Sequence, residues 1–150
     1  MNGTTMSSNQ YELASAPSGA RAVELWLQHA AGFIIFEDAR RYALDQLDAG
    51  LSTEARVAAE KSVDDAIYGV MMILDGVTGS LSNARESVEL QVVVKLVDRD
   101  PNASVPVKAQ VDLADGDGMC LGYHGWLEGD FGGDLVVSQS QDGADSEAEE

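Results

Sequence analysis

The sequence contains one cysteine, three prolines and nine basic residues among its 150 residues. With only Cys120, no intrachain disulfide can form. No apolar run approaches the roughly 18 residues that a membrane-spanning helix needs. Residues 1–10 lack the basic-then-apolar order of a signal peptide. We therefore expect a protein of a reducing compartment, most simply a bacterial cytoplasm, with no membrane partner.

Positive charge is scarce, because 26 acidic residues stand against nine basic ones and give a formal net charge of -17. Such a surface repels the phosphates of nucleic acids and anionic lipids, and it attracts cations and basic proteins. We therefore expect no nucleic-acid partner and a basic protein partner. The alternative is that the acidity only keeps the protein soluble.

The strongest pattern is an apolar stripe at helical spacing between residues 52 and 77. Positions three and four apart share one face of an α-helix, and the stripe consists of Val63, Ile67, Val70, Leu74 and Val77. Ser52 or Thr53 is the expected N-cap, since a hydroxyl accepts from the free N–H groups of the first turn. Gly76 and Gly79 permit the chain to reverse after this helix.

A first long helix is predicted over residues 19–48, with Gly50 as a left-handed C-cap. Its run 33–36, Phe-Ile-Ile-Phe, is apolar on every side. A helix of this kind is buried on more than one face, so either other elements of the chain cover it or part of it meets another chain. A homodimer through this first helix is therefore one hypothesis. The short connection to the second helix predicts two antiparallel neighbours.

The periodicity changes to two after residue 87, which predicts β-strands over residues 88–97 and 105–113. Asp100-Pro101-Asn102 is the expected turn between them. Residues 119–131 contain several glycines, each of which costs a helix interior roughly 1 kcal/mol relative to alanine, so a third strand is predicted there. A glycine-punctuated loop or a short helix is the alternative. Residues 135–137 are a candidate last strand.

These elements predict an α+β fold, in which two long antiparallel helices pack on one face of an antiparallel β-meander of three to four strands. Residues 1–18 are predicted to form a flexible N-terminal arm, residues 19–138 a single α+β domain, and residues 139–150 a disordered acidic tail. The predicted core consists of Phe33, Ile34, Phe36, Leu44, Leu47, Val63, Ile67, Val70, Leu74, Val88, Leu90, Val92, Val94, Val107, Val111 and Leu113.

Motifs for metal, cofactor and nucleophilic chemistry are not found. Cys120 and His124 are four residues apart, but one cysteine and two histidines are too few for a standard structural zinc site. An EF-hand reading from Asp117 fails, because hydrophobic residues occupy its third and fifth positions. Nucleophile-elbow, phosphate-loop and dinucleotide motifs are missing as well. We predict no catalytic residue, no metal ligand and no cofactor.

Acidic residues of the two helices form a weaker candidate. Antiparallel pairing would place Glu37 or Asp38 near Asp64 or Asp65 and would raise the pKa of one carboxyl group. The alternative is an ordinary solvated acidic face.

The most unusual stretch is residues 122–133, where three aromatics and a histidine stand among glycines and acids. Exposed tyrosine and tryptophan often anchor interfaces. The candidate binding residues are Tyr123, His124, Trp126, Glu128, Asp130 and Phe131. The alternative is that Trp126 and Phe131 close one end of the core.

The function that we expect is that of a non-enzymatic protein-binding module that docks a basic protein. In size, acidity and α+β make-up the chain resembles the small bacterial immunity and antitoxin-type proteins, a resemblance that implies an inhibitor of a cationic toxin. The alternative is a small-molecule or metal-dependent enzyme with a pocket near His124 and Asp130.

Overall fold

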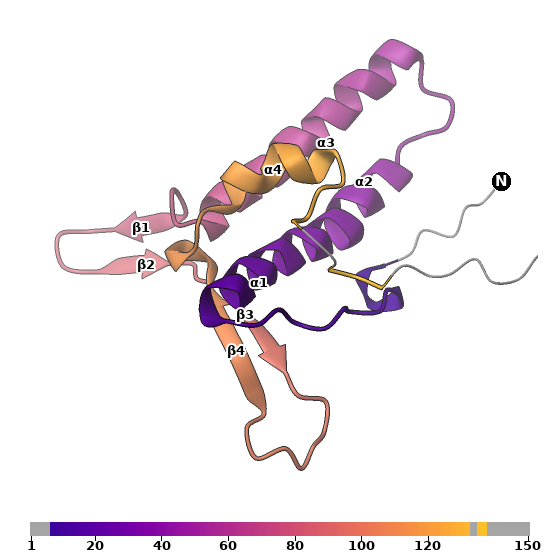
Figure 1. Ribbon diagram of the computed structural model, residues 1–150. Helices are drawn as coiled ribbons and strands as arrows, with labels where there is room; N and C mark the ends of the chain where they lie inside the picture. Colours follow the sequence, from indigo (N-terminus) through magenta and orange to yellow (C-terminus); the bar gives the residue numbers. More distant parts are fainter. Residues whose placement is uncertain (1–6, 133–134, 138–150) are drawn as a thin grey trace, which may run out of the picture.

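The computed structural model describes residues 7–132 and 135–137, and it shows the predicted α+β fold (Figure 1). Helices are combined with two small antiparallel sheets. The predicted acidic tail lies outside the described residues. Within the described part of the chain, every helix is too short or too polar to cross a membrane.

The first predicted helix forms, but with a wider turn inside it. It consists of α1 (Ala20–Ile35), a π-helical turn η2 (Phe36–Arg40) and α2 (Arg41–Asp45). A π-turn bonds residues five apart and so takes in one residue more than an α-turn. The prediction of Gly50 as a left-handed C-cap is wrong. The helix already ends at Gln46, and the N–H of Gly50 bonds to Oδ1 of Asp48 at 2.7 Å within the following loop.

The second predicted helix is α3 (Thr53–Leu74). Its N-cap is Ser52, as predicted, and the Ser52 hydroxyl accepts from the N–H of Ala55 at 3.2 Å. The chain reverses after α3 through Gly76 and Gly79, whose φ angles are +72° and +89°. Figure 1 shows α2 and α3 running back alongside each other.

The strands form two separate hairpins instead of one meander. β1 (Ser80–Ser82) pairs with β2 (Ser87–Glu89), and β3 (Val93–Val97) pairs with β4 (Val107–Asp112). The single strand predicted over residues 88–97 is thus divided at residues 90–92. Its alternation continues through the break, and periodicity alone does not say where a strand changes its partner.

Residues 119–131 form a helix, so the prediction of a third strand is wrong. Helix α4 (Met119–Leu127) follows a short 3₁₀ turn, η3 (Leu113–Asp115). One of the glycines that argued against a helix, Gly122, is needed for close packing, as shown below. Residues 135–137 form no regular strand; Val136 makes an isolated bridge with Leu13, which lies just after the 3₁₀ turn η1 (Ser8–Gln10).

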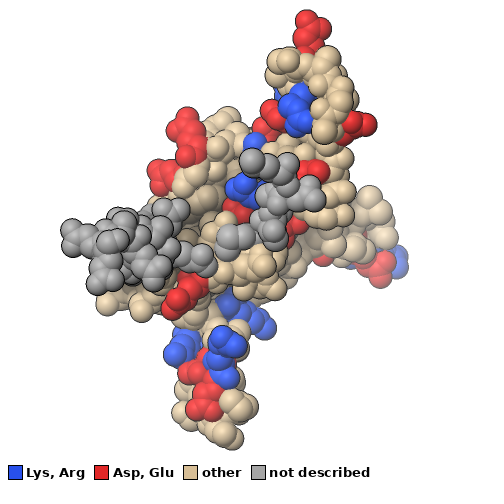
Figure 2. Space-filling model, turned by 90° about the vertical axis from the view of Figure 1, so that its right-hand side faces the viewer, with Lys and Arg blue, Asp and Glu red and all other residues tan. Residues whose placement is uncertain are grey.

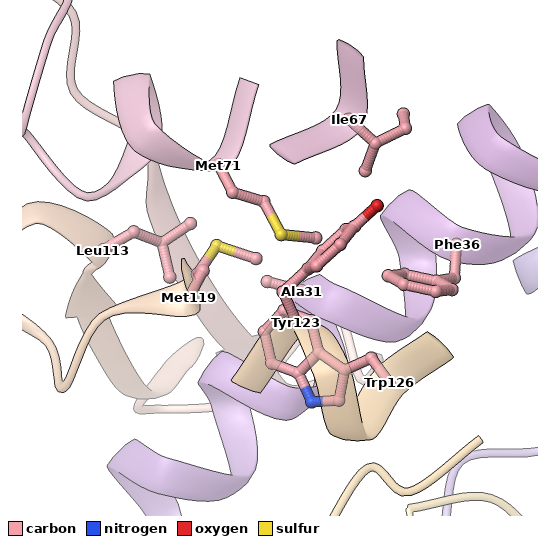
Figure 3. Packing of buried hydrophobic residues seen from close by; sticks show 8 residues of the cluster. All are labelled: Ala31, Phe36, Ile67, Met71, Leu113, Met119, Tyr123 and Trp126. Atoms are coloured by element: carbon pink, nitrogen blue, oxygen red, sulfur yellow. The ribbon is translucent and has the colours of Figure 1, made fainter. Parts of the chain in front are cut away.

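Helix α1 lies between two layers. On one side the β3–β4 hairpin covers Trp26 and Leu27, with Val111 buried against them. On the other side α3 and α4 cover Ala31 and Phe36 (Figure 3). The sheet therefore packs mainly against α1, while α3 packs on α2, η2 and α4. Within the run 33–36, Phe33 packs on the first side and Phe36 on the second. Ile34 is 48% exposed, so the run is not covered on every side.

The predicted core is partly correct. Four of its residues are buried: Phe36, Ile67, Val111 and Leu113. Six are exposed, so their assignment to the core is wrong: Ile34, Val70, Val88, Leu90, Val92 and Val107. Most of the missed core residues come from α1 and α4: Trp26, Leu27, Met71, Met119, Tyr123 and Trp126. The exposed set lies largely on the hairpins, because these project from the body instead of covering both helices (Figure 1).

Candidate binding surface

Two of the six predicted site residues are core residues. Tyr123 and Trp126 retain 5% and 3% of their surface. The hydroxyl of Tyr123 donates to the backbone carbonyl of Asp64 on α3 at 2.6 Å. Burial is the main reason why the pKa of Tyr123 rises to about 12. Both side chains attach α4 to the body, and their predicted role in binding stays a prediction.

The ring of Trp126 lies between two glycines on two helices. A Cβ atom on Gly32 of α1 would lie 2.7 Å from Cζ3 of Trp126, and one on Gly122 of α4 would lie 2.7 Å from Cζ2. Real Cβ atoms do not approach ring carbons so closely. Both positions therefore require glycine, which lets the indole fill the space between α1 and α4.

Trp126 is also held by a specific hydrogen bond. Its Nε1–H donates to Nδ1 of His29 at 3.0 Å. Burial lowers the pKa of His29, while the nearby carboxylates of Asp130 and Asp117 act in the opposite direction. The neutral imidazole is therefore the form that the folded chain favours.

Phe131 is half-buried and closes the core from outside. It stacks on Trp126 with ring centroids 6.1 Å apart and an interplanar angle of 13°. Phe131 also makes T-shaped ring contacts with Phe33 of α1 and Phe36 of η2. Its position fits the alternative in which Trp126 and Phe131 close one end of the core.

The remaining three predicted site residues, His124, Glu128 and Asp130, are exposed. The turn after α4 is fixed by the backbone, because the N–H of Asp130 donates to the carbonyl of Gly125 at 2.9 Å. Oδ1 of Asp130 accepts from the N–H of Gly132 at 3.0 Å. The acidic end of α4 thus stands on a rigid support of packed aromatics.

The beginning of α4 is capped from another helix. Asp75, just after α3, accepts from the N–H of Met119 at 2.6 Å and from that of Cys120 at 2.9 Å. A carboxylate here satisfies free donors and matches the positive end of the helix dipole. Burial is the main cause, and Asp75 a further one, of the rise in the pKa of Cys120 to about 11. The thiol is therefore protonated at neutral pH.

The acidic residues of the two long helices bind different partners. Arg40 pairs with Asp64 at 2.6 Å, and Arg41 pairs with the buried Glu37 at 2.9 Å. Asp38 accepts from the backbone N–H of Ser8 at 2.7 Å and from its hydroxyl, while Lys61 pairs with Asp65. Asp38 thus joins the π-turn to the segment before α1, and the Arg40–Asp64 pair joins it to α3.

Asp117, in the loop before α4, lies beside the N-terminal end of α1. Asp117 pairs with Arg21, and this guanidinium holds the pKa of Asp117 below its usual range. The buried amide of Gln28 accepts from the backbone N–H of Asp117 at 2.9 Å and donates to its carboxylate at 3.3 Å. The loop before α4 is thereby fixed to α1.

Two cavities lie away from the predicted pocket. One of about 250 Å³ has a mostly apolar lining that includes Tyr11, Leu13, Phe33 and Ile34, beneath the segment before α1. The other, of about 290 Å³, is polar and lies between the end of α3 and the β1–β2 hairpin. Neither is lined by His124 or Asp130.

The sequence interpretation missed the exposed apolar face of the first hairpin. Leu81 and Val88 are paired directly across β1 and β2, and they are 79% and 68% exposed. Val88 was placed in the core because it alternates with polar residues. The serines around both positions are a signal that could have identified a short, separate hairpin.

Among the residues that the structure describes, no group of three or more His, Cys, Asp or Glu side chains is arranged to hold a metal ion. Comparison of the chain with protein-family models, with curated proteins and with solved structures finds no match.

Proposed function

We propose that this chain is a non-enzymatic protein-binding module whose acidic body docks a basic protein. The observation that carries the proposal is the uneven distribution of charge. Outside the hairpin region 80–112, the described residues include 15 acidic and five basic side chains, a net charge of -10. Residues 80–112 contain five acidic and four basic side chains, a net charge of -1.

The few cations of the body are already engaged. Arg21, Arg40, Arg41 and Lys61 each form an ion pair with a carboxylate of the chain. Arg56 donates to the backbone carbonyl of Asp48 at 3.2 Å. The excess carboxylates therefore face solvent without a matching number of cations, and Figure 2 shows Asp and Glu spread over the body.

Within the body, we place the contact at the end of α4. The described residues 113–132 contain four acidic side chains and no lysine or arginine. Glu128 and Asp130 are exposed there beside His124, and Trp126 stacks on Phe131 below this end of α4. A preorganised acidic surface loses little entropy when it binds a cationic partner.

The form of this function that we expect is inhibition of a cationic protein, as the resemblance to immunity and antitoxin-type proteins implies. The test uses a defined basic protein, such as ribonuclease A, and a neutral protein of similar size, with the full chain immobilised. Electrostatic steering predicts that the association rate with the basic probe falls steeply between about 0.01 and 0.15 M salt. Binding that ignores salt, or equal binding of the neutral protein, contradicts the proposal.

A pair of matched variants locates the contact. The double variant Glu128→Gln/Asp130→Asn removes two charges at the end of α4. Asp48→Asn/Glu54→Gln removes two exposed charges at the loop between α2 and α3. We expect the first variant to reduce the association rate several-fold more than the second. Equal reductions mean that only total charge matters.

A further inference from the structure

The β1–β2 hairpin presents an apolar face that the described chain does not cover. All six residues of its strands are exposed. Leu81 and Val88 lie side by side on one face because they are a directly opposed pair. Leu90 and Val92 follow Val88 at a spacing of two and are 59% and 40% exposed. Residues 90–92 belong to neither strand, so Leu90 and Val92 add exposed apolar surface to the segment between β2 and β3.

A two-stranded ribbon is at best marginally stable by itself in water. In Figure 1 the β1–β2 hairpin projects away from the helices, and the β3–β4 hairpin projects in another direction. The outward side of β3 adds Val93 and Val97, which are 43% and 52% exposed. Exposed apolar side chains that lie together can form an interaction site, and the outer edges of paired strands can accept another chain.

The charge of this region determines which partner fits it. Residues 77–97 contain two acidic and two basic side chains, so this segment carries no net charge. In Figure 2 the lower projection, which is the β3–β4 hairpin, also shows Lys and Arg beside Asp and Glu. Two copies of this acidic chain repel each other over their bodies but meet little repulsion here. A basic partner, in contrast, gains little electrostatic attraction from a nearly neutral surface.

We propose that residues 77–97, named here the hairpin surface, are the site at which a second copy of this chain docks. The two copies pack their Leu81–Val88 faces together across a two-fold axis, the commonest symmetry of soluble oligomers. The exposed apolar side chains that this contact would bury include Leu81, Val88, Leu90 and Val92. This interface leaves the acidic end of α4 outside its contacts, so one dimer carries two sites for the proposed basic partner.

The first experiment measures the oligomeric state of the full chain by sedimentation and light scattering, from low micromolar to several hundred micromolar concentration. We expect a dimer whose population rises with concentration and with salt, because salt screens the repulsion between two acidic bodies. The proposed binding of a basic protein has the opposite salt dependence, so the two proposals fail separately. A monomer at every concentration and salt overturns the proposal.

The second experiment compares Leu81→Asp/Val88→Asp with the control Val57→Asp. Val57 is 60% exposed on α3, away from the hairpin surface. The double variant is expected to weaken dimerisation at least tenfold, and the control to leave it unchanged. Circular dichroism and a cooperative unfolding transition establish that the body of each variant is folded. Equal weakening in both variants overturns the proposal.

A cross-linking experiment preserves the apolar face and so does not depend on that variant folding. In a Cys120→Ser background, Leu81→Cys places one thiol near the two-fold axis, and Val57→Cys serves as the control. An added disulfide oxidant such as diamide accepts the two electrons and two protons that two thiols lose when they join. We expect a covalent dimer from Leu81→Cys and little from Val57→Cys. Equal cross-linking, or a hairpin that binds another protein while the chain alone stays monomeric, overturns the proposal.

Discussion

Nε1 of Trp126 donates a hydrogen bond to Nδ1 of His29 at 3.0 Å, and this bond joins α4 to α1 inside the packed aromatic cluster. Nδ1 accepts a proton only while it carries none, so the bond requires the neutral imidazole tautomer with its hydrogen on Nε2. Protonation of His29 turns both ring nitrogens into donors. The attachment of α4 therefore depends on the charge state of one histidine.

We predict that the chain loses stability as the pH falls from 7.5 to 5.5. Burial lowers the pKa of His29 in the folded state below its usual 6.5, so the unfolded chain binds this proton more readily. The contribution of His29 to stability is complete above pH 6.5 and is lost as the pH falls through the folded pKa. The midpoint of urea unfolding at the two pH values measures the loss.

The matched variants for this prediction are His29→Asn and His124→Asn. Asparagine at position 29 offers an acceptor near the position of Nδ1 that does not titrate in this range, so the pH dependence between 7.5 and 5.5 becomes smaller. The same change at the exposed His124 is expected to leave the pH dependence of stability unchanged. An unchanged slope in His29→Asn would falsify the assignment.

The glycines beside Trp126 predict a second set of stability changes. Gly32→Ala and Gly122→Ala each put a methyl group within 2.7 Å of the indole, and we expect each to destabilise the fold by about 1–3 kcal/mol through overpacking. Gly69 in α3 has no atom within 4 Å of its added Cβ. Gly69→Ala is therefore expected to stabilise by up to about 1 kcal/mol, the helix-propensity difference. Urea unfolding of the three variants provides the comparison, and three changes of the same sign contradict the packing described.

Cys120 is predicted to react slowly despite being half-exposed. Its pKa of about 11 leaves little thiolate at pH 8. Alkylation by iodoacetamide at pH 8 is expected to be slow in the folded chain and to accelerate many-fold in urea, where the thiol regains its ordinary pKa. Mass spectrometry of timed samples measures both rates. Folded and unfolded rates that are the same would contradict the environment assigned to Cys120.

Asp75 is expected to stabilise α4 through its cap. Asp75→Ala removes the acceptor for the N–H groups of Met119 and Cys120, and the loss of such a cap costs about 0.5–2 kcal/mol. The same change is expected to speed alkylation of Cys120, because a negative charge beside the thiol is gone. Asp115→Ala, in the exposed loop before α4, is the control. Equal destabilisation by both changes contradicts the capping role.

The two long helices were predictable because their own sequence determines them. The helical spacing of α3 and the cap at Ser52 are local signals, and the helix forms at nearly the predicted positions. Of the predicted stripe, Ile67 is buried, whereas Val70 and Val77 are exposed. The π-turn at Phe36–Arg40 has no comparable signal. It depends on simultaneous contacts with three segments that are distant in sequence, including those of Asp38 with Ser8 and of Arg40 with Asp64.

Helix α4 was not predictable from the residues within it. Gly122 and Gly125 lower helix propensity, so a local interpretation favours a strand. The structure offsets this cost with contacts from outside the segment, namely the Asp75 cap and the insertion of Trp126 against Gly32. The same absence of tertiary information led Val88 to be placed in the core, although no helix covers it.

The extra residue in the π-turn has a consequence for insertions and deletions. A π-turn accommodates one additional residue locally and leaves the helix on either side in phase. Shortening Phe36–Arg40 by its exposed Ala39 is therefore expected to merge α1 and α2 into one regular helix with both apolar faces still aligned. The altered spacing between Asp38 and Arg40 would release the contact of Asp38 with Ser8 or that of Arg40 with Asp64 on α3. A change of length in this turn is thus expected to alter how the helix attaches to the rest of the chain more than how much helix forms. Circular dichroism measures the helix content, and limited proteolysis measures the loosened attachment.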